Sequence, residues 1–437
     1  MEQNTVCTTV QAGLCCGCGV CKGICPKGSI SWERKSGLYT PQVNEELCVH
    51  CGVCASVCPG LGHRYEPAKS AAETVTGPVL ACYNAWSLDA ALRHVSASGG
   101  VVSTLIQKLL ADGAYDGAFC LDSYDYREQL KTRLYTFEDT AAHWSASNAP
   151  KSRYLPVSHE SAVAYMKEHR MARLIFVGTA CAVRGLQAAI NKLNLDRGQY
   201  LFIGLFCDKV FNYNVISYFN DTYSPDSPLE ALHFKNKESG GWPGDMKFFP
   251  KEGEPFYRPL ADRMKAKAYF MPERCLYCID KLNACADISL GDNYTGKDAS
   301  KLGSNSVIIR TPAGESAWAV ARSLLEIHEI GIGEIQNAQA IDYRLNNLYY
   351  GDLKAKTIDD HLDLNTGVPR EKDSASFRSA MKADLKKLQA GAFYDTNPSV
   401  LYRQIEKDNK APDPLVKFIK RCFNFLKRKL RRIAKNS

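Results

Sequence analysis

Short apolar segments alternate with amphipathic segments along most of this 437-residue chain, beginning at Val79. The apolar runs predict strands at 79–86, 115–121, 127–137, 173–178, 199–207, 286–292 and 305–311. Apolar residues at helical spacing predict helices at 100–113 and 181–193, a helix from the last of these strands through Ile327, and helical segments around 337–347 and 376–390. The segments 229–235 and 245–249 are expected to pair as antiparallel strands around the Gly-Gly-Trp-Pro turn at 240–243. This order predicts an α/β body with a mixed sheet.

The first 62 residues have a different pattern, built on two runs of cysteines. Each run has the spacing C-x2-C-x2-C-x3-C followed by proline: Cys15, Cys18, Cys21 and Cys25 before Pro26, and Cys48, Cys51, Cys54 and Cys58 before Pro59. This spacing is the signature of bacterial-type ferredoxins, in which the fourth cysteine of one run ligates the cluster of the other run. We therefore expect one [4Fe–4S] cluster on Cys15, Cys18, Cys21 and Cys58, and another on Cys48, Cys51, Cys54 and Cys25. The alternative is a pair of zinc sites or a disulfide scaffold, but zinc ligands typically come as two separated pairs.

These patterns divide the chain into four parts. Residues 1–62 are predicted to form a bacterial-type 2[4Fe–4S] ferredoxin-like α+β module, followed by a linker at 63–78 that contains Pro67 and the Gly77-Pro78 turn. Residues 79–395 are the α/β body, and residues 396–437 are a basic C-terminal tail.

Composition indicates a reducing compartment. The chain has 18 cysteines that cluster with metal-ligand spacing, and iron–sulfur ligation requires thiolates. The N-terminal segment has no basic and apolar leader, and no stretch approaches about twenty apolar residues, so we expect a cytoplasmic protein without a membrane span. The net charge of +8 comes from residues 415–437, which contain nine Lys or Arg and no acidic residue. The remaining chain is close to neutral, which argues against binding to nucleic acid.

The segment 415–437 has the pattern of a basic amphipathic helix. Lys and Arg lie opposite an apolar stripe that consists of Leu415, Phe418, Ile419, Cys422, Leu426, Leu430 and Ile433. This pattern is typical of a helix at an anionic membrane surface, and equally of a helix docked on a partner or on the body itself.

Two polar segments of the body are candidates for cofactor contacts. In the turn at 96–100, Ser98 can cap the following helix, and Gly99 and Gly100 expose backbone N–H groups that suit a phosphate or pyrophosphate. A plain capped helix is the simpler interpretation of this turn. The segment Lys151-Ser152-Arg153 offers two cations and a hydroxyl for a phosphate or a flavin, or else forms a solvated loop.

Four further cysteines lie at informative places. Cys181 begins a helix after a strand, Cys207 ends a strand, and Cys275 and Cys278 form a C-x2-C pair. Such positions produce accessible thiolates, so these four are candidates for a third [4Fe–4S] cluster. Cys285 is a rival fourth ligand, and a core role is the alternative for Cys181 and Cys207. The other cysteines outside the two runs are interpreted as ordinary residues: Cys7, Cys16, Cys82, Cys120 and Cys422.

Six features in this order resemble one protein family over roughly residues 1–350. They are the two-cluster module, SASGGVVSTL, SASNAPKSRY, FVGTACAVRGL, GLFCDKVFNY and CLYCIDKLNACADISLGD. The chain resembles the coenzyme F-420 (deazaflavin) hydrogenase and dehydrogenase beta subunits, to which plant-type 7-hydroxymethyl chlorophyll a reductase is also similar. Ala180, where that family usually has proline, and Cys285 depart from its pattern.

The resemblance implies bound FAD and iron–sulfur clusters, which exchange electrons with a diffusible hydride carrier or an organic substrate. It implies that six residues contact the flavin, namely Ser98, Gly99, Gly100, Lys151, Ser152 and Arg153. It also supports a third cluster on the set Cys181, Cys207, Cys275 and Cys278.

We therefore expect a flavin- and iron–sulfur-dependent oxidoreductase. The clusters would carry single electrons, FAD would convert between single electrons and a hydride, and the protein would set positions and potentials. Lys237 is the candidate for a catalytic charge near the flavin or substrate. The expected partners are an electron donor or acceptor protein or a hydride carrier. The alternatives are a non-catalytic electron-transfer subunit and, from the tail alone, a membrane-surface accessory protein of cell-envelope glycan synthesis.

Overall fold

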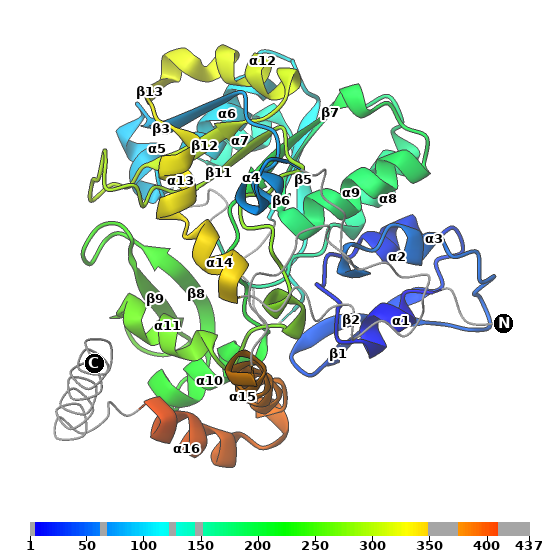
Figure 1. The fold of residues 1–437 in the computed structure, drawn as a ribbon, viewed down its shortest axis with the longest axis vertical. Coiled ribbons are helices and arrows are strands. Elements are labelled where there is room, and N and C mark those ends of the chain that lie inside the picture. Colours follow the sequence, from blue (N-terminus) through cyan, green and yellow to red (C-terminus); the bar gives the residue numbers. More distant parts are fainter. Residues whose placement is uncertain (1–4, 62–67, 122–127, 145–151, 348–374, 410–437) are drawn as a thin grey trace, which may run out of the picture. The chain divides into compact units, whose positions relative to one another are not determined.

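The computed structural model describes residues 5–61, 68–121, 128–144, 152–347 and 375–409 (Figure 1). The chain divides into two compact units, Met1–Asp395 and Thr396–Ser437. The first unit contains both the ferredoxin-like module and the α/β body. In the second unit the structure describes α16 (Pro398–Asn409), and the predicted amphipathic segment at 415–437 lies outside the described residues.

The N-terminal module consists of two cysteine loops that each lead into a short helix. α1 (Cys7–Gln11) precedes the first loop, which enters α2 (Val20–Ile24), and the second loop enters α3 (Val53–Ser56) and then η1 (Pro59–Leu61). β1 (Ile30–Lys35) and β2 (Leu38–Val43) form an antiparallel hairpin between the loops. Gly19 and Gly52 are the N-caps of α2 and α3, with φ of 76° and 71°. Glycine adopts this left-handed conformation without steric cost, so both loops turn sharply into their helices.

The body is organised around an eight-stranded mixed sheet with the order β13-β3-β12-β11-β7-β6-β4-β5. Its strands are β3 (Ala81–Ser87), β4 (Gly117–Leu121), β5 (Thr132–Tyr135), β6 (Leu174–Thr179), β7 (Tyr200–Leu205), β11 (Ile288–Asp292), β12 (Asn305–Ile309) and β13 (Leu325–Glu329). The neighbours β11, β7, β6 and β4 are parallel, and antiparallel strands continue the sheet on both sides. Their carboxyl ends therefore lie at one edge of the sheet, which is where ligands bind in open α/β sheets.

Alternate side chains of the strands fill two separate cores. On one face Ile175 and Leu201 pack with α6 (Val101–Ala111) and α12 (Pro312–Ala321). On the other face Phe176 and Phe202 pack with α8 (Glu160–Glu168) and α9 (Ala180–Lys192), and residues of α2 join this second core. Each fully buried large apolar side chain contributes roughly 1.5–3 kcal/mol, so these cores are the main source of stability.

A smaller sheet with the order β10-β9-β8 lies beside α10 (Asn214–Tyr223) and α11 (Leu260–Lys267) (Figure 1). Its strands are β8 (Leu229–Asn236), β9 (Asp245–Pro250) and β10 (Phe256–Arg258). The remaining helices of the described first unit are α4 (Ala71–Thr76), α5 (Ala90–Val95), α7 (Phe137–His143), α13 (Ile332–Ala338), α14 (Ile341–Asn347), α15 (Ala375–Ala392) and the 3-10 turns η2 (Arg197–Gln199), η3 (Glu273–Leu276) and η4 (Arg322–Leu324). None of the helices within the described ranges is long and apolar enough to span a membrane.

The mixed α/β body and the ferredoxin-like module are confirmed, and two local predictions differ from the structure. The helix predicted through Ile327 ends at Ala321, and Leu325–Glu329 is the edge strand β13, which pairs with β3. Apolar and polar residues alternate in Leu-Glu-Ile-His-Glu, which fits a strand with one buried face better than a helix. The helical segment predicted at 337–347 is divided between α13 and α14, because Ala340 has a positive φ of 52°.

The N-terminus of α8 connects the module to the body. The Glu160 carboxylate accepts hydrogen bonds from Lys22 Nζ (3.1 Å) and Trp32 Nε1 (2.5 Å). The backbone N–H of His159 donates to the Cys18 carbonyl (2.8 Å). A Cβ at Gly23 would lie 2.6 Å from the Glu160 carbonyl oxygen, so α2 and α8 approach at backbone distance. The module is thus seated on the body through specific polar contacts and close packing.

We predict that His159 makes this interface sensitive to acid. Its side chain is 3% exposed, Nδ1 has no hydrogen-bond partner among the described residues, and burial lowers its pKa to about 4. Because the folded pKa lies below the ordinary value of about 6.5, the stabilisation from neutral His159 is present above pH 6.5 and is lost as the pH falls toward 4. The maximum loss is roughly 3 kcal/mol. His159→Gln should therefore reduce the fall in thermal unfolding temperature between pH 7 and pH 4.5.

The matched control is His94→Gln, which changes an exposed histidine of α5. The thermal unfolding temperature of this control should fall between pH 7 and pH 4.5 by as much as that of the natural protein. An equal acid response in the natural protein and in His159→Gln would contradict the prediction.

Candidate functional site

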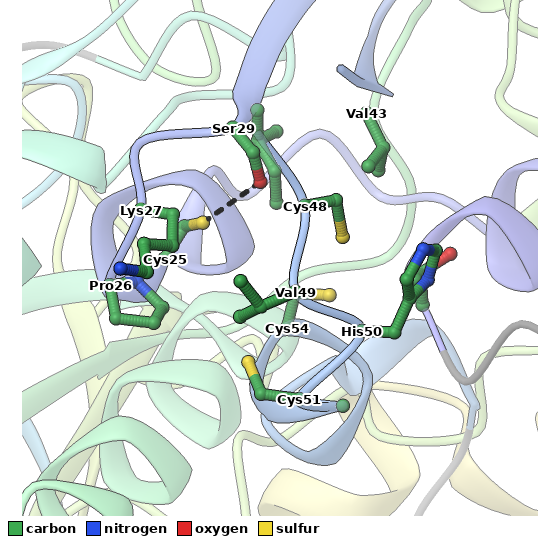
Figure 2. A pocket seen from close by; sticks show the side chains of 13 residues that line it. Cys25, Pro26, Lys27, Ser29, Val43, Cys48, Val49, His50, Cys51 and Cys54 are labelled. Carbon is green, nitrogen blue, oxygen red and sulfur yellow. Dashed lines mark hydrogen bonds between the residues drawn. The ribbon is translucent and has the colours of Figure 1, made fainter. Parts of the chain in front are cut away.

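Four cysteines from both runs line one pocket of the module (Figure 2). Cys25, the last cysteine of the first run, lies with Cys48, Cys51 and Cys54 of the second run around the same hollow. Cys51 is exposed and the other three are partly buried. Figure 2 shows that Val49 and His50 stand among these thiols, and Val49 is 57% exposed. This set therefore lies at the surface of the first unit.

Local hydrogen bonds favour the thiolate form of Cys25. Burial alone would raise the pKa of this thiol, but hydrogen bonds from the Ser29 side chain and from the backbone N–H groups of Lys27, Ser29 and Gly28 outweigh burial and lower the pKa. The Ser29 Oγ lies 3.3 Å from the Cys25 Sγ (Figure 2). Because the thiolate is the form that binds iron, this turn is prepared for a metal ligand.

The other cysteines of the module form a second, more buried set. Burial first, and then the neighbouring Cys58, raise the pKa of Cys15 to about 12. Burial, and then Cys58 and Cys15, raise the pKa of Cys21 well above the ordinary value. Cys18 interacts electrostatically with Cys21 and Cys58. Cys58 of the second run thus lies with the first run, as Cys25 lies with the second. Cys21 also interacts with Cys54, so the two sets are neighbours.

A third set of thiols forms in the body at the carboxyl ends of β6 and β7. Cys207 follows β7, and its pKa is raised well above the ordinary value by burial and then by Cys275, Cys181 and Cys278. Burial and the neighbouring Cys278 and Cys181 raise the pKa of Cys275 to about 11. The structure therefore brings together all four cysteines that the sequence singled out. Cys285 instead interacts with Arg184, Asp280 and Arg310 and packs into the second core.

Buried cations stand beside this third set. Arg274 interacts electrostatically with Cys181 and Cys275, and its Nη1 is buried without a hydrogen-bond partner among the described residues. Arg344 acts on Cys207 and donates to the carbonyl of Cys278 (2.7 Å). A buried guanidinium nitrogen without a partner, next to four partly buried thiols, fits an anionic group bound beside them.

Cys16 is a site residue that sequence reasoning missed. Its thiol interacts electrostatically with the thiols of Cys18 and Cys181, which belong to two different sets, and the residue packs against the core that contains Cys18. The sequence offered little signal, because Cys16 lies inside the first run but outside its spacing, and its partner Cys181 is 165 positions away.

Within the described ranges, no three His, Cys, Asp or Glu side chains lie together in the manner of a single-metal-ion site. A single zinc ion would hold sulfurs at about 2.3 Å from the metal and hence close to one another. An iron–sulfur cube is larger, so its four thiolates lie farther apart.

The turn at 96–100 leads into α6, but Ser98 does not cap this helix as predicted. The N-cap of α6 is Gly100, with φ of 82°, and Ser98 Oγ donates instead to the Ser304 carbonyl (2.8 Å). The expected Ser98 cap is therefore wrong, because the left-handed Gly100 forms the turn itself. A Cβ at Gly99 would lie 2.7 Å from Asn305 Oδ1, and that buried oxygen has no hydrogen-bond partner among the described residues.

The described part of the second polar segment directly precedes Tyr154, which interacts with Lys235. Arg153 is 3% exposed, Ser152 is exposed, and Lys151 lies outside the described residues. Next to them, Lys235 Nζ forms a buried ion pair with Asp292, the last residue of β11. Asp292 interacts with Ser98 and Lys235 with Tyr154, so this pair links the two segments.

Asp292 has further partners that the sequence did not indicate. It accepts hydrogen bonds from Trp242 Nε1 (3.2 Å) and from the Tyr294 hydroxyl (3.2 Å). Burial would raise the pKa of Asp292, but Lys235 outweighs burial and lowers it, so the carboxylate is charged. The signal for Asp292 was its position at the end of the predicted strand 286–292.

Lys237 connects three separate backbone segments through its side-chain ammonium group. Its Nζ donates to the backbone carbonyls of Arg93, Ser98 and Leu302, each at 2.6 Å. An ammonium group has three N–H donors, and these three carbonyls match that number. The catalytic role of Lys237 stays a prediction, whereas its contact with the 96–100 turn is direct.

Three family models match the chain. Two of them describe the beta subunit of coenzyme F420 hydrogenase/dehydrogenase: the model of its N-terminal part matches residues 82–163, and the model of its C-terminal part matches residues 171–332. The third describes a 4Fe-4S dicluster domain and matches residues 14–60.

Two curated relatives come from organisms of the genus Methanosarcina. A component of the F(420)H(2) dehydrogenase of Methanosarcina mazei is 24% identical over 327 residues, which cover 73% of this chain and 86% of that protein. The beta subunit of the coenzyme F420 hydrogenase of Methanosarcina barkeri is 23% identical over 264 residues, which cover 58% of this chain and 83% of that protein.

Among solved structures, the chain is similar to one chain of the xenon-derivatised F420-reducing [NiFe] hydrogenase complex from Methanosarcina barkeri. The identity is 20% and the TM-score is 0.48, and the match covers 68% of this chain and 98% of the other.

We predict that Lys237→Met loosens the 96–100 turn. The substitution leaves buried carbonyls without their charged donor, and a lost hydrogen bond to a charged group costs roughly 1.5–3 kcal/mol. The thermal unfolding temperature should fall, and hydrogen exchange at Gly99 and Gly100 should accelerate. Lys251→Met, at an exposed lysine, is the control and should change neither. Unchanged exchange at these glycines in Lys237→Met would show that the hydrogen bonds of Lys237 are not needed.

Proposed function

The chain belongs to the family of coenzyme F420 hydrogenase/dehydrogenase beta subunits, and from that premise we propose that it is an iron–sulfur flavoprotein oxidoreductase. Its dicluster domain carries two [4Fe–4S] clusters that transfer electrons. We infer in addition a third [4Fe–4S] cluster and a bound FAD in the body. The observation that carries this proposal is that the third cysteine set and the 96–100 turn, whose Ser98 interacts with Asp292 at the end of β11, lie at the carboxyl edge of the same sheet.

The proposed ligands follow the three cysteine sets. Cys25, Cys48, Cys51 and Cys54 hold the surface cluster, and Cys15, Cys18, Cys21 and Cys58 hold the buried cluster of the module. Cys181, Cys207, Cys275 and Cys278 hold the third cluster. Buried thiols with raised pKa values fit such ligands, because iron displaces the proton that burial favours. The cation of Arg274 supports the negative charge of the third cluster.

The burial of the three sets gives the proposed order of electron transfer. The set that contains Cys51 reaches the surface, and the neighbouring set contains the buried Cys18 and Cys21. Cys15 of that second set interacts with Cys181 of the third set. Electrons would therefore exchange with a partner protein at the surface cluster and pass through the buried cluster to the third one.

The residues at the sheet edge fit a flavin cofactor. Arg153 offers a buried cation, and Asn305 Oδ1 is a buried acceptor close to Gly99 at the start of α6. We propose that these residues, with Ser98, Lys151 and Ser152, contact FAD, which would interconvert single electrons and a hydride. The Lys235–Asp292 pair, with Trp242 and Tyr294, would orient the group that exchanges the hydride.

The names of the Methanosarcina relatives suggest the substrate class. One is named as part of an F420H2 dehydrogenase and the other as part of an F420 hydrogenase. We propose that this chain likewise exchanges a hydride with a deazaflavin-type carrier or a similar organic substrate, and that it works with partner subunits. A non-catalytic electron-transfer subunit would have the clusters but no flavin.

We predict that each of the three cysteine sets binds its own iron–sulfur cluster and can lose it independently of the other two. Oxygen-free protein should contain about four irons for each of three clusters. Cys25→Ala and Cys181→Ala should each lose one cluster or convert it to a three-iron form, while the other two remain visible by EPR spectroscopy. Cys120→Ala changes a buried cysteine of β4 outside the sets and should keep all of the iron. Full iron and unchanged EPR spectra in Cys181→Ala would remove the third cluster from the proposal.

We predict that Arg153→Met releases flavin without affecting the clusters. Loss of a charge-assisted hydrogen bond costs roughly 1.5–3 kcal/mol, which weakens FAD binding at least about tenfold. Flavin is measured by absorbance after denaturation, and iron is measured in the same sample. Arg322→Met, at an exposed arginine, should keep both. Natural protein with clusters but no flavin would favour the non-catalytic electron-transfer subunit.

A further inference from the structure

The corner between α13 and α14 reaches two segments that carry cysteines of the third set. Arg344 of α14 donates from Nη1 to the Asp208 carboxylate (2.9 Å) and from Nη2 to the Asp208 carbonyl (3.0 Å). The same Nη2 donates to the Cys278 carbonyl (2.7 Å). Because Asp208 directly follows Cys207, one guanidinium joins the segments of Cys207 and Cys278.

Further hydrogen bonds connect these segments to the same corner. The backbone N–H of Cys207 donates to the Lys281 carbonyl (2.9 Å), and Lys281 Nζ donates to the Gln339 carbonyl (2.7 Å). Gln339 lies between the two helices, is buried, and donates from Nε2 to the Asp292 carbonyl (2.9 Å). The corner therefore links the third cysteine set to Asp292 at the end of β11.

Apolar packing fixes the corner against the loop that follows the C-x2-C pair. Ile335 of α13 and Ile341 of α14 lie in one buried cluster with Ile279 and Leu282 of that loop. Arg344 is only 6% exposed, so its charged group is held inside this packing. A buried arginine is costly unless acceptors surround it, and the three acceptors all belong to the segments of the third set.

We propose that Arg344 is a positioning residue for the third iron–sulfur cluster, which holds the segments of Cys207 and Cys278 together and places a positive charge beside them. This inference rests on the proposed function, because it requires those two cysteines to be iron ligands. Arg344 is not a ligand itself, since it acts through two carbonyls and a carboxylate. It lies beyond residue 332, where the match to the family ends.

The shape and the charge of Arg344 have separate effects. A planar guanidinium serves several acceptors at once, whereas lysine offers a compact charge on a flexible stem. A positive charge stabilises the more negative, reduced state of a cluster and so raises its reduction potential. The Asp208 carboxylate faces both Arg344 and Lys267, so one positive charge of this group is not neutralised.

The experiment is an EPR-monitored redox titration of the full-length, oxygen-free protein and its variants, with the release of iron to a chelator measured in parallel. The signal that disappears in Cys181→Ala identifies the third cluster. In Arg344→Gln we expect a more negative midpoint potential for this cluster and faster release of its iron. Arg344→Lys keeps the charge and should restore most of the potential, but its iron should still be released faster than in the natural protein.

The matched control is Arg197→Gln, which removes the ion pair of Arg197 with Asp287 (2.8 Å) at the amino ends of β7 and β11. This control should leave the potential and the iron of the third cluster unchanged. Loss of the third cluster alone in Arg344→Gln would also support the proposal. If Arg344→Gln does not fold, the release of iron is compared in Arg344→Lys.

Two results would overturn the proposal. One is a third cluster in the folded Arg344 variants that keeps its potential and its rate of iron release. The other is an equal change in all three clusters, which would make Arg344 a residue of general stability. A failure of the proposed function is distinguishable, because the natural protein would then show only two clusters, and the inference would fail with it.

Discussion

The structure depends on one constraint: thiols from distant segments must lie close together, most of them partly or fully buried. Burial opposes their ionisation, and it raises the pKa of Cys15 to about 12 and that of Cys275 to about 11. When these thiols are deprotonated, their negative charges repel one another, so their proximity alone does not stabilise the fold. In the proposed clusters, iron would supply the positive charge that makes a set of four thiolates favourable, so the free energy of cluster binding would also be free energy of folding. The polar contacts of Glu160 and His159 then fix where the module lies on the body.

The large sheet explains why the chemistry of the body lies at one edge. Four parallel strands end there, and Cys181, Cys207 and Asp292 occur at the ends of three of them. The turn at 96–100 reaches the same edge, where Lys237 and Ser304 hold Ser98. Charged groups are buried here in pairs or against carbonyls, as Lys235 with Asp292 and Lys237 with three carbonyls illustrate. A rigid polar frame of this kind positions a cofactor better than mobile surface loops would.

The sequence predicted the parts that depend on local spacing. The cysteine runs indicated the module and the exchange of Cys25 and Cys58 between the sets, and apolar runs located most strands of the sheet. Features that depend on contacts across the fold were missed. Cys16 had no local signal because its partner Cys181 comes from another element, and the capping role given to Ser98 failed because Gly100 forms the turn. The ion pair of Lys235 with Asp292 joins two sheets, and neither residue's neighbours in the sequence reveal the other.

The central claim is that the three cysteine sets and the sheet edge form one continuous path for electrons. The most direct test is a stoichiometric reductive titration of the oxygen-free natural protein, with clusters and flavin followed by absorbance and EPR spectroscopy. The account predicts that one electron is taken up for each of three clusters and two for the flavin, and that all centres equilibrate when reductant reaches only the surface cluster. Uptake limited to two single electrons, with no flavin signal, would contradict it.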